Sequence, residues 1–477
     1  MPSDILSVIS EKFHQAPLSL RQLFLKTLGT RLFSEANDIK RTKAALAKEI
    51  GWDEQTVESV FTGDASLEQT LQLLSLVVQT YPVSLKDLWL DLPLDQGCVV
   101  ITPGQSQASA RVFSRPRFSD PQSATDISPY YEYRDTAMAA QAPFRPEWIL
   151  QLRHVSDADP YNPEVIYNKG HLMNQFTFFI GEVNFYWEDQ GKKYAREMNT
   201  GDSCHITPYA PHSFTSRNPE QPGLIIAVTY GDQIRRANNH LALDAQSQPS
   251  YLKDVLSTCA PQREIHSPFN LALRLHFDAD LLTHEQLAQQ ADMSIERLKA
   301  LLSSAKPTQE EVSNLAQALA LRPEDLFQPV DAQAVDFSIF EQTPWFEDAS
   351  TASCHKALAR SQSQPGMKSF ILEIRSDSKQ RLQQHAYHQY VYNYSDQTVL
   401  LTLQDNQQQS LEPGASCYVQ PYIAHAFSLP ANSSTSQAAS LLIVRLAAEL
   451  NQAATIELAQ INQTGRQQLL GKTSQWF

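Results

Sequence analysis

The spacing of hydrophobic residues changes along the chain between a helical and a strand-like pattern. From residue 41 to 89 apolar positions recur every three or four residues, with a break at Gly51 and a second helix predicted after Asp53. From about residue 97 to 235 short aromatic and β-branched segments alternate with Gly, Pro, Asn and Asp, which is typical of antiparallel strands. We therefore expect a helical unit followed by a β unit.

The same plan occurs a second time. Residues 283–327 repeat the helical pattern, and their ending EDLF matches KDLW of the first copy. Strand-like segments follow from about residue 335 to 448, where YVQPYIAHAF aligns with HITPYAPHSF, so that His425 pairs with His212. The predicted fold class is α+β, a tandem repeat of a helical, helix-turn-helix-like domain and a β-barrel.

The predicted domain boundaries follow these changes in pattern. At 477 residues the chain exceeds one ordinary domain of about 100–200 residues, in keeping with several units. The expected order is a first helical domain at 1–96, a first barrel at 97–240, a second helical domain at 241–332, a second barrel at 333–450 and a C-terminal tail at 451–477.

Composition narrows the class of protein. With 42% hydrophobic residues, the chain has no apolar stretch near the roughly 20 residues of a spanning helix, and its start lacks a basic segment followed by an apolar block. We expect a cytoplasmic protein with no membrane partner. The five cysteines are scattered singly, without CxxC spacing, and are expected to be inert thiols.

The helix-turn-helix-like pattern raises a second class of function, a ligand-sensing regulator that binds DNA. The formal net charge of −14 opposes a phosphate backbone. The predicted recognition helix of the first copy also carries Asp53, Glu54 and Glu58, where phosphate contacts call for Arg or Lys. We therefore expect no nucleic-acid partner, and the regulator stays an alternative.

Three side chains in the first β unit suggest a metal site. His171 and Gln175 are four residues apart, and His212 follows Pro211 on a later strand, so the three can meet at one mouth of a barrel. Two imidazoles and one oxygen donor are the ligand set of a facial triad on Fe(II). A single buried His or Gln more often only satisfies its hydrogen bonds, and a metal-dependent isomerase or a sugar binder remains open.

The neutral amide of Gln175 has an electrostatic consequence. A carboxylate would lower the local charge of Fe(II) from +2 to +1, whereas the amide leaves it at +2, which suits a dianionic, bidentate ligand. The second β unit keeps His385, Gln389 and His425 but has Leu382 in place of Asn168. We expect the second unit to be structural, and its capacity to bind metal is left open.

The segment from Asn168 to His171, followed by Gln175 and by His212, resembles the bicupin phosphonate oxygenases, which include hydroxyethylphosphonate dioxygenase and hydroxypropylphosphonate epoxidase. The resemblance covers nearly the whole chain. It implies cupin barrels, Fe(II), O2 and a small phosphonate substrate. Glutamine as third ligand is similar to the methylphosphonate synthase branch, which cleaves 2-hydroxyethylphosphonate to methylphosphonate and bicarbonate. The dioxygenase outcome, hydroxymethylphosphonate and formate, is the alternative.

The same resemblance implies which residues hold the substrate. It assigns phosphonate contacts to Asn168, Tyr131, Tyr133, Lys26 and Arg117. Lys26, from the first helical domain, and Tyr133 are also given catalytic roles, with the helical domain acting as a lid. Arg115 is the other arginine of this region. The alternative for the tyrosines is that they are strand aromatics packed in a core.

Overall fold

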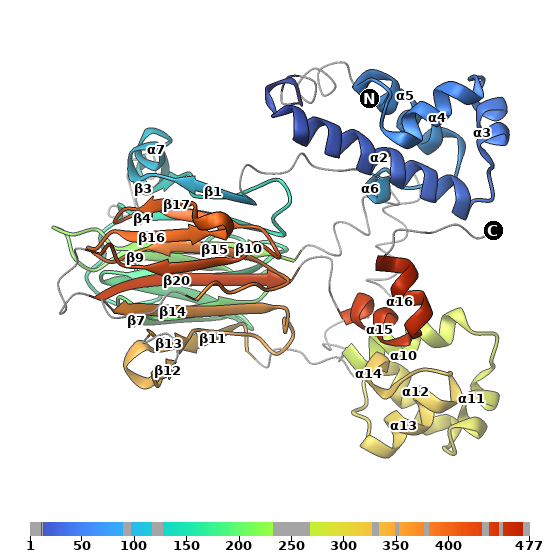
Figure 1. The fold of residues 1–477 in the computed structure, drawn as a ribbon. Helices are drawn as coiled ribbons and strands as arrows, with labels where there is room; N and C mark the ends of the chain where they lie inside the picture. Colours follow the sequence, from blue (N-terminus) through green and yellow to red (C-terminus); the bar gives the residue numbers. More distant parts are fainter. Residues whose placement is uncertain are drawn as a thin grey trace.

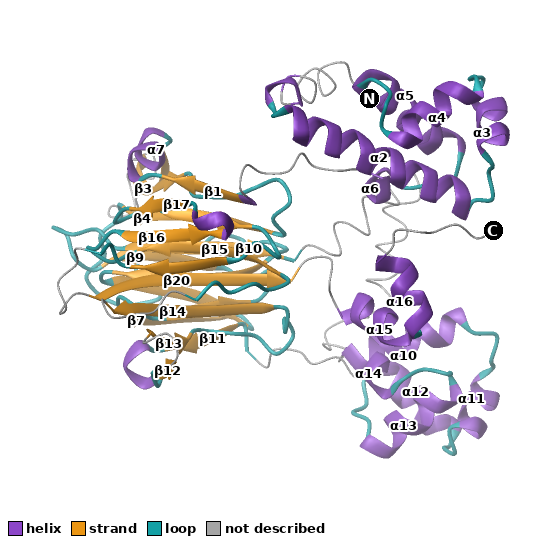
Figure 2. Cartoon of the chain, in the orientation of Figure 1, coloured by secondary structure: helices purple, strands orange, loops and turns teal. Residues whose placement is uncertain are grey.

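A computed structural model describes residues 11, 13–88, 97–116, 127–231, 268–326, 333–348, 353–375, 381–431, 438–447 and 452–470. It confirms a mixed fold in which helices and antiparallel sheets are segregated (Figure 2). Two helical units lie on one side of the β part (Figure 1). In the described part of the chain, no helix has the length and apolarity needed to cross a membrane.

Each helical unit packs around its own apolar cluster. The first unit comprises α2 (Leu18–Asp38), α3 (Lys43–Ile50), α4 (Glu54–Thr62), α5 (Leu67–Thr80) and α6 (Leu85–Leu88). The second comprises α10 (Pro268–Ala279), α11 (His284–Gln290), α12 (Ile295–Ser303), α13 (Gln309–Ala318) and α14 (Pro323–Leu326). In the segment predicted as a tail, residues 452–470 are described and form two further helices, α15 (Gln452–Gln460) and α16 (Gln463–Leu470).

The repeat is visible in how the helices begin and end. Thr42 caps α3 and Thr283 caps α11, each accepting a hydrogen bond from a backbone N–H three residues on. After these helices the chain turns through the left-handed region, at Gly51 with φ +76° and at Asp292 with φ +50°. Gly and Asp tolerate this conformation, which explains why both residues serve at the same turn.

The acidic residues at the start and on one face of α4 form contacts within the first unit. Asp53 caps the helix by accepting from the N–H of Thr56. Glu58 lies 2.6 Å from the ammonium of Lys43, and Glu54 lies 3.8 Å from it. This face of the helix therefore presents carboxylates and one paired lysine.

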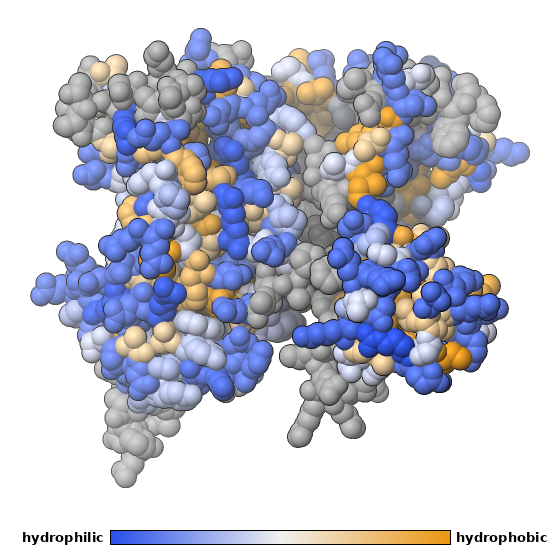
Figure 3. All heavy atoms as spheres, turned by 90° about the horizontal axis from the view of Figure 1, so that it is seen from below, coloured by the Kyte–Doolittle hydropathy of each residue, from blue (hydrophilic) through white to orange (hydrophobic). Residues whose placement is uncertain are grey.

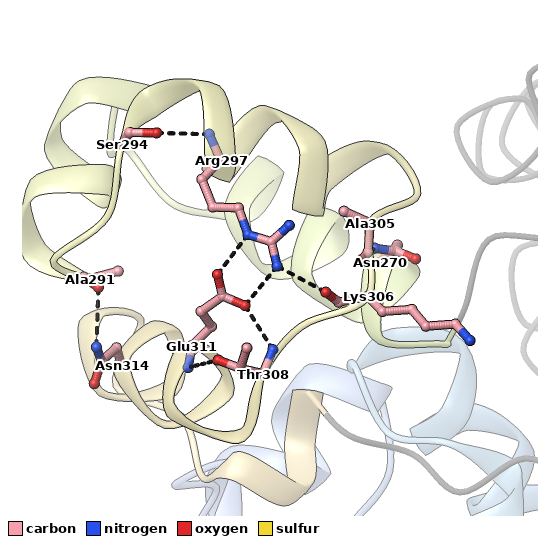
Figure 4. Close-up of polar contacts among 9 residues, drawn as sticks. All are labelled: Asn270, Ala291, Ser294, Arg297, Ala305, Lys306, Thr308, Glu311 and Asn314. Carbon is pink, nitrogen blue, oxygen red and sulfur yellow. Dashed lines mark hydrogen bonds and ion pairs between the residues drawn. The ribbon is translucent and has the colours of Figure 1, made fainter.

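A bidentate ion pair joins α12 and α13 of the second unit (Figure 4). The guanidinium of Arg297 donates to both carboxylate oxygens of Glu311, at 2.6 and 2.9 Å, and also to the carbonyl of Lys306. Asn270, buried on α10, donates to the carbonyls of Leu301 and Ala305. The hydrogen bonds from Arg297 lower the pKa of Glu311 from 4.5 to about 2.

This depressed pKa predicts a stability contribution that depends on pH. The contribution is present above the ordinary carboxyl pKa and is lost as pH falls through 4.5 toward 2. Glu311→Gln keeps the capping contact with Thr308 but removes the charge. We expect wild type to unfold at a higher temperature than this variant at neutral pH, with the difference shrinking below about pH 4. Circular dichroism melts of both proteins test this, and a difference independent of pH would contradict it.

The strands of the described residues form four sheets, two large and two small. Strands of the first half are β1 (Cys98–Ile101), β2 (Arg111–Pro116), β3 (Ile127–Arg134), β4 (Phe144–Gln151), β5 (Asn174–Ile180), β6 (Val183–Asp189), β7 (Lys192–Met198), β8 (Ser203–Ile206), β9 (His212–Ser216) and β10 (Leu224–Tyr230), with the short helix α7 (Pro103–Ala108) after β1. Strands of the second half are β11 (Val335–Ser338), β12 (Phe346–Asp348), β13 (Ser353–Ala357), β14 (Met367–Arg375), β15 (Tyr387–Asn393), β16 (Val399–Leu403), β17 (Gln408–Leu411), β18 (Ser416–Val419), β19 (His425–Ser428) and β20 (Ala438–Ala447).

The prediction of closed barrels differs from the strand pairing. In each β unit a seven-stranded sheet faces a three-stranded sheet, and the described strands do not close into one hydrogen-bonded ring. The first unit has the orders β11-β8-β5-β10-β4-β3-β2 and β7-β6-β9, and the second has β1-β18-β15-β20-β14-β13-β12 and β17-β16-β19.

The two β units exchange their first strands. β1 pairs with β18 of the second unit, and β11 pairs with β8 of the first. The predicted division at 97–240 and 333–450 therefore separates each of these strands from the sheet in which it lies. Local pattern could not predict the exchange, because a strand's side-chain alternation does not specify which sheet edge it joins.

The large sheets of the two units pack against each other. On β5 and β10, alternate residues face the second unit and join one shared cluster, including Phe176, Phe178 and Val228. The Trp148 indole N–H donates to the hydroxyl of Tyr392 across this boundary at 3.0 Å. The other faces of β5 and β10 point into the interior of the first unit, and the other faces of β15 and β20 point into the interior of the second. On the face seen in Figure 3, apolar side chains form small groups among hydrophilic ones.

Candidate metal and substrate site

A pocket of about 290 Å³ opens into the first β unit, near the lower end of the ~300–1,000 Å³ range for small-molecule sites. Strands β2, β3, β4, β5, β9 and β10 and the segment before β5 supply its walls. The pocket is lined by Arg115, Tyr131, Tyr133, Arg145, Glu147, Ile149, Ile166, Asn168, His171, Met173, Gln175, His212, Phe214 and Thr229.

The two-residue period of the strands explains the lining. Arg145, Glu147 and Ile149 are alternate residues of β4 and share the pocket face. Their neighbours Phe144 and Trp148 face the other way, into the cluster shared with the second unit. Reading this alternation would have brought Arg145 and Glu147 into the candidate site, which motif reasoning missed.

His171 and Gln175 meet as predicted. The His171 Nε2 atom lies 3.0 Å from Gln175 Oε1, and its Nδ1 lies 2.8 Å from the carbonyl oxygen of Met173. The Met173 carbonyl and Gln175 Oε1 are both hydrogen-bond acceptors. A neutral imidazole has a single N–H, so it can donate to one of them, and at the other its nitrogen lone pair faces an oxygen lone pair. With the proton on His171 Nδ1, both His171 Nε2 and Gln175 Oε1 have a lone pair available to bind a metal. Two ligand atoms at right angles, each about 2.1 Å from one metal, would lie about 3.0 Å apart, which matches this contact.

Gly170 allows the segment carrying His171 to lie where it does. Its φ is +73°, and a Cβ there would stand 2.5 Å from the backbone of Tyr209. The backbone N–H of Tyr209 donates to the His171 carbonyl at 2.8 Å. A glycine at this position is therefore needed to bring His171 against the turn that precedes β9.

His212 is the third member of the set and is buried. Its Nδ1 lies 2.9 Å from the carbonyl of Ala210, which directs the Nε2 lone pair toward the pocket. The rings of His171 and His212 are 5.4 Å apart and nearly perpendicular. Burial lowers the pKa of His212 to about 4, so its imidazole is neutral at pH 7 and needs no deprotonation to bind a metal. The donor set therefore fits a divalent cation with two imidazoles and one amide oxygen.

Asn168 is held as a donor beside His212. Its side-chain oxygen accepts from the backbone N–H groups of Gly170 and His212, both at 2.9 Å. These two bonds fix the orientation of the amide, and its NH2 group lies 3.0 Å from His212 Nε2. A donor fixed in this way is suited to a phosphonate oxygen bound next to the metal position.

The two predicted tyrosines occupy different settings. The hydroxyl of Tyr131 accepts from the backbone N–H of Phe214 at 3.1 Å and lies 3.3 Å from Ser213 Oγ. Tyr133 also lines the pocket, and within the described residues its hydroxyl has no hydrogen-bond partner. Burial and then the nearby Glu147 carboxylate raise the pKa of Tyr133 to about 12, which keeps its hydroxyl protonated. Tyr133 is the tyrosine placed to donate to a ligand.

Charged residues surround the same space. Arg115 and Arg145 line the pocket, whereas Arg117 lies outside the described residues. Burial raises the pKa of Glu147, partly offset by His171 and nearby arginines, which favours its protonated form and reduces repulsion of an anionic ligand. Lys26 is exposed on α2 and is absent from the described pocket lining.

A search of curated proteins supplies the decisive observation. The chain is 33% identical over 469 residues to methylphosphonate synthase of Nitrosopumilus maritimus strain SCM1, covering 95% of this chain and 96% of that protein. The chain belongs to the methylphosphonate synthase family. No protein-family model matches the sequence.

Solved structures agree with this family membership. A Streptomyces albus enzyme, described as HEPD with substrate 2-hydroxyethylphosphonate and Fe(II) bound, is 30% identical with a TM-score of 0.72, covering 95% of this chain and 99% of its own. A hydroxyethylphosphonate dioxygenase structure at 18% identity has a TM-score of 0.67 over 93% of this chain and supports the fold alone. The curated synthase and these two structures each match at least 93% of this chain.

Proposed function

We propose that this chain is an Fe(II)- and O2-dependent methylphosphonate synthase. It cleaves the carbon–carbon bond of 2-hydroxyethylphosphonate to give methylphosphonate, bicarbonate and one proton. Atoms and charge balance with one O2, and the four electrons come from the substrate carbon, so no further reductant is consumed. The observation that carries the proposal is the neutral set of His171, Gln175 and His212 in the pocket of a chain with this family membership.

In this proposal His171 Nε2, Gln175 Oε1 and His212 Nε2 hold Fe(II). Bound iron(II) supplies the open coordination positions and the redox chemistry with O2. The amide of Gln175 leaves the metal's charge uncompensated, which favours a dianionic substrate as the completing ligand. Metal affinity is therefore expected to rise when the phosphonate is present.

The remaining pocket residues orient the substrate. Asn168, fixed by two backbone N–H groups, donates to a phosphonate oxygen. Tyr133 donates its hydroxyl, and Arg115 and Arg145 supply positive charge. Tyr131 holds the strand that carries His212 through its bond to Phe214. These contacts determine which carbon faces the metal, and so govern the product.

The tyrosines provide a matched pair of variants. Tyr133→Phe should raise KM for 2-hydroxyethylphosphonate about 10-fold or more, since a hydrogen bond to a charged group contributes about 1.5–3 kcal/mol. Tyr131→Phe should instead lower the free energy of unfolding by about 1–3 kcal/mol, because it leaves a buried N–H without an acceptor. Steady-state kinetics and denaturant titration of both variants test this. The opposite pattern would exchange their roles.

Two further assignments are part of the proposal. Each β unit is a cupin, so that the chain is a bicupin with a helix-turn-helix-like unit before each copy, supported by the repeated caps and sheet orders.

Lys26 contacts the substrate when the first helical unit covers the pocket. Lys26→Ala should then raise KM without changing iron content.

The reaction itself is tested by product analysis. The protein is loaded anaerobically with Fe(II), given 2-hydroxyethylphosphonate and O2 without reductant, and followed by phosphorus and carbon NMR. Methylphosphonate with bicarbonate supports the proposal. Hydroxymethylphosphonate with formate would make the chain a dioxygenase, and unchanged substrate would exclude both.

A further inference from the structure

The second β unit keeps the same three side-chain types in the same places as the first. His385 Nε2 lies 3.2 Å from Gln389 Oε1, and Gln389 Nε2 lies 2.9 Å from His425 Nε2. The rings of His385 and His425 are 5.5 Å apart at 88°, against 5.4 Å and 87° in the first unit. A donor set of the first unit's geometry is therefore retained.

The surroundings of the two sets of side chains differ at one position. On β10, Thr229 pairs with Gln175, and on β20, Arg445 pairs with Gln389. Arg445 is thus the equivalent of Thr229, because each lies opposite the glutamine on the neighbouring strand. Its Nε donates to Gln389 Oε1 at 2.7 Å, using the oxygen that the first unit leaves open.

The hydrogen bonds of the second set are complete without a metal. The backbone N–H of Tyr387 donates to His385 Nδ1, so the ring proton of His385 lies on Nε2 and is donated to Gln389. Gln389 donates to His425 Nε2, while His425 Nδ1 donates to the carbonyl of Ile423 at 2.8 Å. Each donor therefore meets an acceptor, whereas in the first unit His171 faces two acceptors.

We propose that the guanidinium of Arg445 takes the place of the metal in the second β unit and keeps a latent His385, Gln389 and His425 site metal-free. This inference rests on the proposed function, because it uses the first unit as the template for a metal site. The guanidinium brings a permanent positive charge beside the donor atoms and repels a divalent cation. Burial lowers the pKa of Arg445 to about 10, which still leaves it charged at pH 7.

A reciprocal exchange of Arg445 and Thr229 tests the proposal. Arg445→Thr gives the second unit the residue of the first, and Thr229→Arg gives the first unit the residue of the second. Metal content is measured after anaerobic loading with Fe(II), and Mn(II) loading with electron paramagnetic resonance provides a readout independent of turnover. We expect one metal per chain in wild type, two in Arg445→Thr and none in Thr229→Arg.

Further variants separate this inference from the proposed function. His171→Ala should bind no metal, and Arg445→Thr with His171→Ala should bind one, in the second unit. Two metals in wild type, or one in a folded Arg445→Thr, would overturn the role of Arg445. One metal in His171→Ala alone would instead overturn the proposed ligand set of the first unit. Circular dichroism of each variant verifies folding before its metal content is compared.

Discussion

Substitution of His171 by alanine is expected to abolish iron binding and oxygen-dependent turnover, and Gln175→Ala should have the same effect. Removing a residue that only orients a ligand costs about 10- to 100-fold in metal affinity, so the loss of a ligand should exceed about 100-fold. Iron content after gel filtration and oxygen uptake with 2-hydroxyethylphosphonate measure the two effects. Full activity in either variant would remove the ligand assignment.

Two variants serve as controls for this prediction. His425→Ala removes the equivalent imidazole of the second unit and should change turnover of the folded protein by less than about twofold, since His425 lies on β19 of the other unit and is not part of the pocket lining. Gln175→Glu should increase affinity for Fe(II), because a carboxylate offsets part of the metal's charge. A large loss of turnover in His425→Ala would mean that the second unit contributes to the reaction.

Much of the fold follows from local sequence. Helix spacing and caps such as Thr42 and Thr283 are short-range features, and they place the two helical units. The exchange of β1 and β11 between the β units is a long-range property, because either strand fits either sheet edge by its own pattern. The same limit explains why the sequence predicted closed barrels where each unit has two facing sheets.

Some residues of the candidate site could likewise be predicted from the sequence, and others could not. His171, Gln175 and His212 are found from spacing and an aligned repeat, and the structure brings them together. Arg145 and Glu147 carry no motif; the alternation along β4 puts them on one face, and the pairing of β4 with β10 turns that face toward the pocket. The blocking role proposed for Arg445 required the pairing of Arg445 with Gln389, which no single-strand pattern contains.

The two β units share a buried apolar cluster. Phe178 has no exposed surface, and its ring centroid lies 5.0 Å from that of Tyr394 in the other unit. Phe178→Ala should lower the free energy of unfolding by about 3–5 kcal/mol, the usual cost of truncating a buried phenylalanine. Because the cluster contains side chains of both units, both should unfold together. Denaturant titration followed by circular dichroism and tryptophan fluorescence measures the change.

The control for this variant is Phe346→Ala on β12, where the side chain is 52% exposed and the expected change is within about 0.5 kcal/mol. Coincident loss of iron binding and of β structure in Phe178→Ala would mean that the second unit supports the first through their common core. Loss of stability with iron binding intact at higher denaturant would mean that the units unfold separately. The first outcome is expected, since β5 carries Gln175 on one face and Phe178 on the other. The strand that positions Gln175 is thereby held in place by packing against the second unit.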